Sequence, residues 1–524
     1  MTTAVALHPA DERDRLRAPR DDALVREVEQ SPGCFGLDEG PFSAYRRTVT
    51  DDADGQVRVT VAFSVRPLFW GWLFVPGMKQ GLVAAPDRWH QHPWWAPPGR
   101  LDRRAADVLG LLCTISIVGG YLGTVITQTA TFAADEFGVG TGAQADLLSA
   151  VRLSVVITLV LSVLADRIGR RRIVSIAALA GIAATAAGAV APSMFGLGAT
   201  QTVARGFAGA LLLLIAIISA EEMPPGSRAW GVSVLAMCQA LGAGMCLWAL
   251  PLADIGGDGS SSWRALYVLP LLYLPLVLLV HRHLPETRRF ELVNRASSPP
   301  ARLAGHGRRF WLLAVTLFLL ALFATPASQL GNDFLKEARG FSGARIAAFT
   351  LLTATPAGIG IIIGGRLADT RGRRLVGAVG VAGGTVLSVV AFSSAGWSLW
   401  VWTLLQNIVS AVVVPALGVY RPELFPTGAR GRAAGAIEVF SLLGAVAGLQ
   451  LVGQLVDGGW TYGSAFALAA VAPIAVAVLV WTSFPETARL SLEAINPEDA
   501  PAVSPSVSPG GEPGAVAPQG PPGP

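Results

Sequence analysis

Three charged side chains lie inside long apolar stretches, where they could bind an ion or carry a proton: Arg152, Arg205 and Glu438. A charge at the centre of an apolar layer costs at least about 2.5 kcal/mol, so each needs a reason to be there. Arg152 precedes Asp166 by fourteen residues and Arg205 precedes Glu221 by sixteen, roughly 21 and 24 Å along a helix. We therefore expect both arginines at similar depth, where a shared cavity would attract a carboxylate or phosphate. Alternatively, Arg205 bonds carbonyl groups at a helix end or polar groups of the first apolar segment.

Glu438 lies eight residues after Arg430, about 12 Å into its own apolar segment. An acid there could carry a proton, or it could pair with an arginine of a charge network. Uncharged polar residues in the apolar stretches are further candidates for lining a cavity, each of them alternatively an interhelical hydrogen-bonding group. They are Gln128, Gln239, Gln329, Asn332 and Asn407.

The other reactive residue types show no catalytic or metal-binding pattern. All six histidines fall in tails or loops, and only the loose pairs His90-x-His92 and His281-x-His283 occur close together. The four cysteines have no metal or disulfide spacing. There is no Ser/His/Asp or Cys/His constellation and no phosphate-binding Walker loop. The sequence therefore predicts neither an enzyme nor an ATP-driven pump, and it implies no metal or other cofactor.

Composition places the chain in a lipid bilayer. Of its 524 residues 52% are hydrophobic and only 15% are charged, against about a quarter in soluble domains. The net charge of +4 is small, and it implies no nucleic-acid partner. Twelve apolar segments are long enough to span a membrane, so the chain is expected to be an all-α membrane protein. The segments lie near 107–131, 143–164, 173–191, 196–220, 229–251, 263–281, 309–330, 344–367, 375–394, 398–420, 433–456 and 462–484.

The distribution of arginine predicts the orientation of these spans. Arginine-rich loops follow the even-numbered spans and precede the first, whereas most odd-numbered loops carry acids. By the positive-inside rule both termini are cytoplasmic, in a multi-pass protein of the plasma membrane. The loop after the seventh span is an exception, because it contains Lys336, Arg339 and Arg345.

The first hundred residues differ from the rest. Residues 1–30 are polar and are expected to form a loose tail, while Val57–Val65 alternates like a strand, so a small cytoplasmic α+β module is predicted. Residues 68–74 are aromatic but too short to cross a bilayer. With the nearby tryptophans they form either an interfacial aromatic belt or the core of the small module. These tryptophans are Trp89, Trp94 and Trp95.

Three charged motifs occur twice, in the same order and at offsets of 203, 202 and 200 residues. Such repetition indicates two homologous six-helix halves, in which Asn407 corresponds to Arg205. The motifs are Asp166-Arg167-x-Gly169-Arg170 with Asp369-x-Arg371-Gly372-Arg373, Glu221-x-x-Pro224-x-x-x-Arg228 with Glu423-x-x-Pro426-x-x-x-Arg430, and Pro285-Glu286-Thr287 with Pro485-Glu486-Thr487.

All these motifs fall at cytoplasmic helix ends, where opposite charges could bridge the two halves. We interpret them as a cytoplasmic gate network that holds the inner side shut until substrate-linked rocking breaks it. The alternative is that the arginines serve only membrane topology, although acids contribute nothing to positive-inside retention. The network residues are Asp166, Arg167, Gly169, Arg170, Glu221, Arg228, Glu286, Asp369, Arg371, Gly372, Arg373, Glu423, Arg430 and Glu486.

With these motifs the chain resembles the major facilitator superfamily, in particular its sugar-porter and organic-ion-transporter branches. Tyr420-x-x-Glu423 and Pro485-Glu486-Thr487 are especially similar to sugar porters, and the resemblance covers roughly 105–493. It implies two pseudo-symmetric six-helix bundles that alternate between outward and inward states around a central site. The expected division is 1–100 for the cytoplasmic module, 101–288 and 309–487 for the bundles, 289–308 for a cytoplasmic central loop and 488–524 for a disordered cytoplasmic tail.

Two departures bear on the substrate. Proton-coupled sugar porters resemble G-Y-D-x-G in the first span, but here Leu122 stands at the position of the acid. The glutamine-rich motif of the seventh span survives only as Gln329-Leu-Gly-Asn332. The sequence therefore predicts a secondary active or facilitative transporter of another small polar or anionic organic metabolite, a symporter if protons are the coupling ion. The rival hypothesis is a membrane sensor whose transporter body gates the N-terminal module.

Overall fold

The computed structural model describes residues 1–52, 55–66, 70–89, 93, 96–139, 147, 150–255, 260–295 and 303–499. Several sequence predictions lie outside these residues and have no structural counterpart here. They concern Leu68, Phe69, His90, His92, Trp94, Trp95, the start of the second span, residues 296–302 of the central loop and the tail beyond residue 499.

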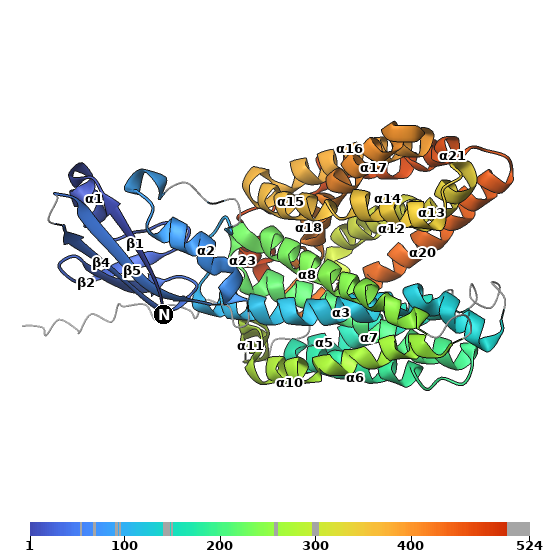
Figure 1. The fold of residues 1–524 in the computed structure, drawn as a ribbon, viewed down its shortest axis with the longest axis horizontal. Helices are drawn as coiled ribbons and strands as arrows, with labels where there is room; N and C mark the ends of the chain where they lie inside the picture. The colour runs from blue at the N-terminus through green and yellow to red at the C-terminus, as the bar shows by residue number, and fades with distance from the viewer. Residues whose placement is uncertain are drawn as a thin grey trace, which may run out of the picture.

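Five antiparallel strands form a sheet at the N-terminus, in the order β1-β5-β4-β3-β2. The sheet and its short helices stand apart from the helical body in Figure 1. The predicted strand Val57–Val65 is confirmed as β5. The elements of this sheet domain are β1 (Thr2–His8), η1 (Ala10–Glu12), α1 (Arg13–Leu16), β2 (Arg26–Ser31), β3 (Cys34–Glu39), β4 (Phe42–Asp51), β5 (Val57–Val65), α2 (Gly71–Leu82) and η2 (Pro86–Arg88).

The prediction of a loose tail over residues 1–30 is wrong. β1 pairs along its whole length with β5, and α1 and β2 follow within the same thirty residues. In β1 the small side chain of Ala4 faces the core, while Val5 and Leu7 are half exposed. Because its larger apolar residues point outward, this edge strand lacks the inward apolar pattern that identifies a strand in a sequence.

Buried charges join the strands of the sheet domain. Arg47 of β4 forms an ion pair of 2.6 Å with Glu27 of β2, and both side chains are almost fully buried. Tyr45 donates its hydroxyl proton to Glu27 at 2.5 Å, and burial raises the pKa of this phenol well above its ordinary value. The ring of Trp89 lies over Arg20 and Arg47, so this tryptophan belongs to the domain core rather than to an aromatic belt.

The membrane body begins with the N-terminal bundle, which runs from α3 to α10. Its longest helix, α3, is almost entirely buried within the body. The helices are α3 (Arg103–Phe137), η3 (Val151–Ser154), α5 (Val155–Ile168), α6 (Arg170–Gly188), α7 (Met194–Glu222), η4 (Pro225–Ser227), α8 (Arg228–Ala249), η5 (Leu250–Asp254), η6 (Ser262–Arg264), α9 (Ala265–Val268), η7 (Leu269–Tyr273) and α10 (Leu274–His283).

The C-terminal bundle, from α12 to α22, repeats this plan. Its second span is broken between α14 and α15 at Pro356, which cannot donate a helical hydrogen bond. The helices are α12 (Gly307–Gln329), α13 (Gly331–Asp333), the π-helix η9 (Phe334–Ala338), α14 (Gly343–Ala354), α15 (Ala357–Arg371), α16 (Arg373–Ser393), α17 (Gly396–Ala411), α18 (Val413–Gly418), α19 (Tyr420–Glu423), η10 (Thr427–Ala429), α20 (Arg430–Asp457), α21 (Tyr462–Ala469) and α22 (Val471–Ser483).

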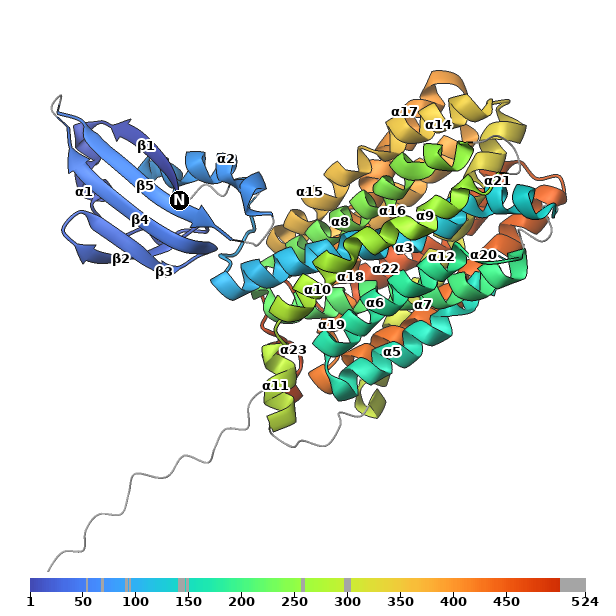
Figure 2. The ribbon, with the colours of Figure 1, turned by 60° about the horizontal axis from the view of Figure 1, so that its bottom comes forward.

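Within the described residues, eleven helices are long and apolar enough to cross a membrane. The segment predicted as the second span is represented by η3 and α5, whose preceding turn lies outside the described residues. The two bundles lie side by side and come together at the end next to the sheet domain (Figure 1), and the turned view also places the sheet domain at one end of the body (Figure 2). The structure therefore confirms an all-α membrane body with a small α+β domain in front of it.

Short elements connect the parts at this end of the body. They are α11 (Arg288–Arg295), η8 (Leu303–His306), α23 (Leu492–Ile495) and η11 (Pro497–Asp499). Residues 488–499, expected in a disordered tail, thus include two ordered helical turns. Leu492 is fully buried in the core of the C-terminal bundle, which explains why the chain does not leave the body at residue 488.

Candidate functional site: an interbundle charge network and a central cavity

The two short loops after α5 and α15 have the same backbone geometry. Gly169 and Gly372 adopt φ of +108° and +104°, a region that strongly favours glycine. A Cβ atom on either would come within 2.5 Å of Glu286 or 2.7 Å of Glu486. Each of these glutamates accepts hydrogen bonds from the first two backbone N–H groups of the next helix, α6 or α16, at 3.1 and 3.2 Å. The third motif therefore caps the helix that the first motif begins.

The two motif aspartates reach across to the opposite bundle. Asp166, at the end of α5, accepts hydrogen bonds from the backbone N–H groups of residues 431 and 432 at 3.1 and 2.9 Å. Asp369, at the end of α15, accepts them from residues 229 and 230 at 3.2 and 2.8 Å. Each carboxylate thus caps the N-terminal end of a helix in the other bundle, α20 or α8, where the helix dipole favours negative charge.

Glu221 at the end of α7 joins the bundles from the N-terminal side. It forms an ion pair of 3.1 Å with Arg170 of its own bundle and a second pair with Arg430 of the C-terminal bundle. All three side chains are fully buried. Arg170 also donates to the carbonyl oxygen of Thr427 in the C-terminal bundle at 2.7 Å.

Glu423 in α19 makes the matching connection from the C-terminal side. It binds Arg373 of its own bundle and Arg228 of the N-terminal bundle, the latter at 3.1 Å. Arg373 also forms an ion pair of 3.2 Å with Asp369 in the preceding helix. The second-motif glutamates therefore share their negative charge between the two bundles in the same way.

Not every residue predicted for the network takes part in it. The side chains of Arg167 and Arg371 are exposed, and neither forms an ion pair with any residue that the structure describes. Sequence reasoning also missed members. The hydroxyl oxygens of Thr287 and Thr487 accept hydrogen bonds from Arg170 and Arg373 at 3.2 and 2.7 Å, and Asp499 pairs with Arg430 at 2.9 Å. The threonines stand in the third motif beside its glutamates, whereas Asp499 lies in a stretch without a repeated signal.

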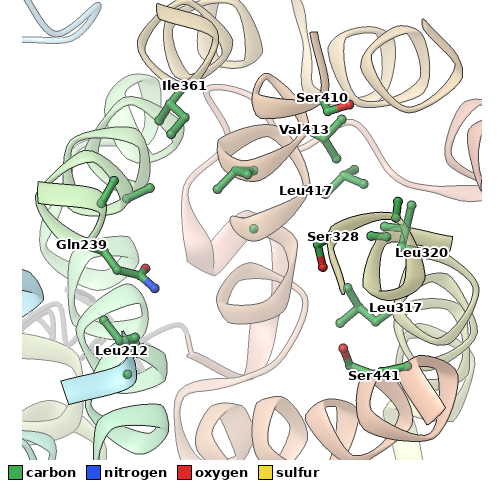
Figure 3. Close-up of a pocket in the computed structure, with 18 of the residues that line it drawn as sticks. Leu212, Gln239, Leu317, Leu320, Ser328, Ile361, Ser410, Val413, Leu417 and Ser441 are labelled. Atoms are coloured by element: carbon green, nitrogen blue, oxygen red, sulfur yellow. The ribbon is translucent and has the colours of Figure 1, made fainter. Parts of the chain in front are cut away.

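Above this network, a cavity of about 1460 Å³ lies between the bundles and is lined by both. Figure 3 shows Gln239 of α8 pointing into the cavity from one side, with Ser328 of α12 and Ser441 of α20 on the other. Much of the remaining wall is aliphatic, including Leu212 and Leu317. The cavity thus has an apolar lining with a few polar groups directed inward, as is usual for small-molecule sites.

Arg152 and Arg205 line the same wall of this cavity, from η3 and α7 of the N-terminal bundle. They lie close enough for their charges to repel each other. Among the described residues, no acid forms an ion pair with either of them, and Leu122, at the position of the acid in the resembled motif, is buried. The N-terminal wall of the cavity therefore carries two positive charges that no acid among the described residues pairs with.

The uncharged polar candidates divide into two groups. Gln239, Asn332 and Asn407 line the cavity, and Asn407 donates its amide proton to the carbonyl oxygen of Thr353 at 3.1 Å. Gln128 and Gln329 are not among the lining residues, so the prediction that they face the cavity is wrong. Both lie in the last turns of predicted spans, where residue order alone does not say which side of the helix faces the centre.

Glu438 lines the cavity on the C-terminal side and forms an ion pair of 2.6 Å with Arg421. Arg421 belongs to the same short helix, α19, as Glu423 of the interbundle network. Glu438 is therefore paired with an arginine, although not with one that the sequence motifs singled out. One four-residue helix thus connects a charge pair in the cavity to the charge pairs between the bundles.

The segment that joins the sheet domain to the body also touches both bundles. The side-chain hydroxyl of Ser227, at the start of the N-terminal bundle's α8, accepts from the backbone N–H of Gly99 at 2.7 Å and donates to its carbonyl oxygen at 3.1 Å. Arg366 of the C-terminal bundle's α15 donates to the carbonyl oxygen of Ala96 at 3.2 Å. Two prolines separate these contacts and favour an extended backbone. We call Ala96–Gly99 the linker strap.

Within the described residues, no cluster of histidine, cysteine and acidic side chains could hold a metal ion. The site consists of a largely apolar cavity with two arginines on one wall, closed at one end by buried ion pairs. Replacing one partner of a buried pair leaves an uncompensated charge, at about 3–5 kcal/mol, so the network can favour one arrangement of the bundles strongly.

Comparison with known proteins agrees with this architecture. A family model described as Major Facilitator Superfamily matches residues 109–402 and 327–508. A cis,cis-muconate transport protein of Acinetobacter baylyi is 24% identical over 314 residues, which cover 56% of this chain and 73% of that protein.

Solved structures share the fold at low sequence identity. The proton:xylose symporter XylE, solved with 6-bromo-6-deoxy-D-glucose, is 16% identical, with a TM-score of 0.65 over 75% of this chain and 98% of that one. The human organic anion transporter MFSD10 is 17% identical, with a TM-score of 0.55 over 72% of this chain and 99% of that one. The chain belongs to the major facilitator superfamily and is a multi-pass membrane transporter, not an enzyme.

Proposed function

We propose that this protein moves a small organic anion across the membrane by alternating access. The observation that carries the proposal is the pair formed by Arg152 and Arg205, two cavity arginines that no described acid neutralises. A guanidinium group binds a carboxylate through two parallel hydrogen bonds, and it does so most strongly where water is partly excluded. The names of two similar proteins, a muconate transporter and an organic anion transporter, support the same substrate class.

The opposite wall suits the rest of such a molecule. Asn407, Ser328 and Ser441 offer uncharged hydrogen-bonding groups from the C-terminal bundle, and aliphatic side chains lie between them. An unsaturated or short aliphatic acid, with carboxylates at one or both ends, would place charge on the arginines and apolar carbon against the leucines. A neutral sugar would leave both arginines without a counter-charge, which favours an acid over a hexose.

The interbundle network serves in this proposal as the cytoplasmic gate. Arginine-rich loops assign its end of the body to the cytoplasm of a plasma-membrane protein. With the network formed, the cytoplasmic end is closed, and rocking of the bundles must break the contacts of Glu221 and Glu423. Substrate binding shifts the balance between the two states by its difference in affinity for them.

Glu438 is the proposed site of proton coupling. Among the described residues that line the cavity it is the only carboxylate, and it already faces a cation, Arg421. Protonation would free Arg421 from its partner, and α19 would carry that change to Glu423 at the gate. A symporter would use this step, whereas a facilitator would not need it.

Uptake by proteoliposomes tests the substrate class. With cis,cis-muconate as the probe, Arg205→Ala is expected to reduce uptake at low substrate concentration at least tenfold, which corresponds to loss of one charge-assisted contact. Arg205→Lys should retain part of the muconate uptake, because the positive charge remains while the bidentate geometry is lost. Arg167→Ala, at an exposed position in the last turn of α5, is the matched control. Unchanged uptake by Arg205→Ala, or equal uptake of xylose and muconate, would exclude the proposed anion site.

A second function is favoured by the linker strap. Because Ala96–Gly99 contacts Ser227 and Arg366 in opposite bundles, residues 1–100 are positioned to respond to the state of the gate, or to control it. In that case the protein is a sensor as well as a transporter. Disrupting the strap while following both gate opening and uptake distinguishes the two functions.

A further inference from the structure

Helix α2 begins where the sheet meets the membrane body, because Gly71 lies against the end of β5 while the residues just before the helix contact α3. Just before it, Arg66 forms an ion pair of 2.9 Å with Asp107, and Trp70 donates its indole proton to the hydroxyl of Thr114 at 3.3 Å. Asp107 is the last charged residue of α3 before its long apolar stretch. Thr114 lies seven residues further, about 10 Å deeper along the helix. Arg66 and Trp70 therefore contact α3 at different depths, and Trp70, just before α2, reaches the apolar part of α3.

The exposed side of α2 changes character along its length. In the first turn, Trp72 and Leu73 are 69% and 50% exposed. In the last turn the exposed residues are Lys79 and Gln80. The opposite side of the helix packs Met78 into the core of the sheet domain. The helix thus exposes apolar side chains at the end next to α3 and polar ones at the end away from it.

We propose that the first turn of α2 inserts Trp72 and Leu73 into the interface of the lipid bilayer and thereby anchors the sheet domain on the membrane surface. Tryptophan favours the headgroup level, where its ring contacts acyl chains and its N–H remains near polar groups. The depth of Thr114 on α3 places these two side chains at that level. A water-exposed pair of large apolar residues at the same place would have no compensating contact.

The alternative occupant of this surface is a second copy of the chain. Lipid is favoured because the exposed apolar residues, Trp72, Leu73 and Pro76, give way in the last turn to Lys79 and Gln80 on the same exposed side. A membrane boundary crossing an obliquely oriented helix produces such a change, whereas a protein partner would extend apolar contact along the helix. The proposal concerns the sheet domain alone and does not depend on the transported substrate.

Site-directed spin labelling in proteoliposomes tests the proposal on the full chain. One label replaces Leu73 (Leu73→Cys) and a matched control replaces Gln80 (Gln80→Cys), in a background with Cys34, Cys113, Cys238 and Cys246 changed to alanine or serine. Both positions are exposed on the same helix. Collisions with oxygen, which partitions into lipid, and with a water-soluble nickel complex report on the surroundings of each label.

At position 73 we expect the ratio of oxygen to nickel accessibility to be several-fold higher than at position 80. Equal, predominantly aqueous accessibility at both positions would overturn the proposal. Low accessibility to both reagents at position 73, with spin–spin broadening between labels, would assign the surface to a second copy and would also overturn it. Trp72→Cys provides an independent label with the same expectation if Leu73→Cys does not fold.

Discussion

Glu221 and Arg430 form a fully buried ion pair although they lie in opposite bundles, at the end of α7 and the start of α20. Glu423 and Arg228 repeat this pairing in the reverse direction. Each glutamate also binds an arginine of its own bundle, so separating the two bundles takes from each carboxylate one of its two buried arginine partners. The contacts are therefore suited to hold two rigid bodies in one of two positions.

Glu221→Gln is expected to open the proposed gate. The substitution leaves Arg170 and Arg430 buried without a carboxylate, which disfavours the closed state by about 3–5 kcal/mol. Spin labels at the exposed positions 167 and 371 should show a broader and longer distance distribution. Glu222→Gln is the matched control, because Glu222 pairs with Arg104 inside its own bundle. An unchanged distribution in Glu221→Gln would contradict the gate assignment.

Gly169→Ala should destabilise the protein at the first of the two loops. The new methyl group would meet the carboxylate of Glu286 at 2.5 Å in a backbone conformation that alanine rarely adopts, so a loss of at least about 1 kcal/mol is expected. Gly244→Ala, within α8 and with no atom near its Cβ, should instead be neutral or stabilising. Thermal unfolding in detergent measures both. Equal melting temperatures for the two variants would show that the loop conformation is not required.

Glu438→Gln is expected to uncouple accumulation from a proton gradient. The glutamine cannot take up and release a proton, so uptake driven by a pH gradient should fall to the level seen without one. Exchange of labelled for unlabelled substrate across the membrane should persist, since the cavity arginines are untouched. Asp457→Asn, which removes a carboxylate at the end of α20 that does not line the cavity, is the control. Gradient-driven accumulation equal to that of the unaltered protein would remove Glu438 from the coupling step.

The repeated motifs made the membrane body predictable, because charges and glycines at helix ends remain visible in a sequence. Which of those charges pair with each other was harder to predict from the sequence. That Asp166 caps a helix of the other bundle follows from bundle packing, which places α5 beside α20, and not from its own motif. The same reason explains why Asp499, far along the chain and outside the repeats, was missed.

The cavity shows a similar division. Arg152 and Arg205 were identified because charge in an apolar segment is rare, and the structure places both on one wall. Gln128 and Gln329 were misassigned because an uncharged amide near a helix end carries no sign of the direction it faces. In the sheet domain, β1 escaped detection because Val5 and Leu7 point away from the core.

The linker strap predicts that the sheet domain restrains the gate. Arg366→Gln removes the contacts with the carbonyl oxygens of Pro93 and Ala96, and Ser227→Ala removes both hydrogen bonds to Gly99. Each lost hydrogen bond is worth about 1 kcal/mol, so the loss of two should raise the ratio of open to closed gate by up to roughly thirtyfold. The same spin labels at positions 167 and 371 report this population.

Thr370→Val is the matched control, because its hydroxyl bonds only within α15, to the carbonyl oxygen of Arg366. If the strap acts solely as a restraint, muconate uptake should change together with the label distances in both strap variants. A sensor predicts a different outcome. In the unaltered protein the label distances should respond to substrate, whereas in the strap variants this response should be lost while muconate uptake stays intact. If the label distances and the uptake of the strap variants both match those of the control, the linker strap merely tethers the sheet domain. Its contacts with the two bundles would then have no effect on the relative motion of the bundles.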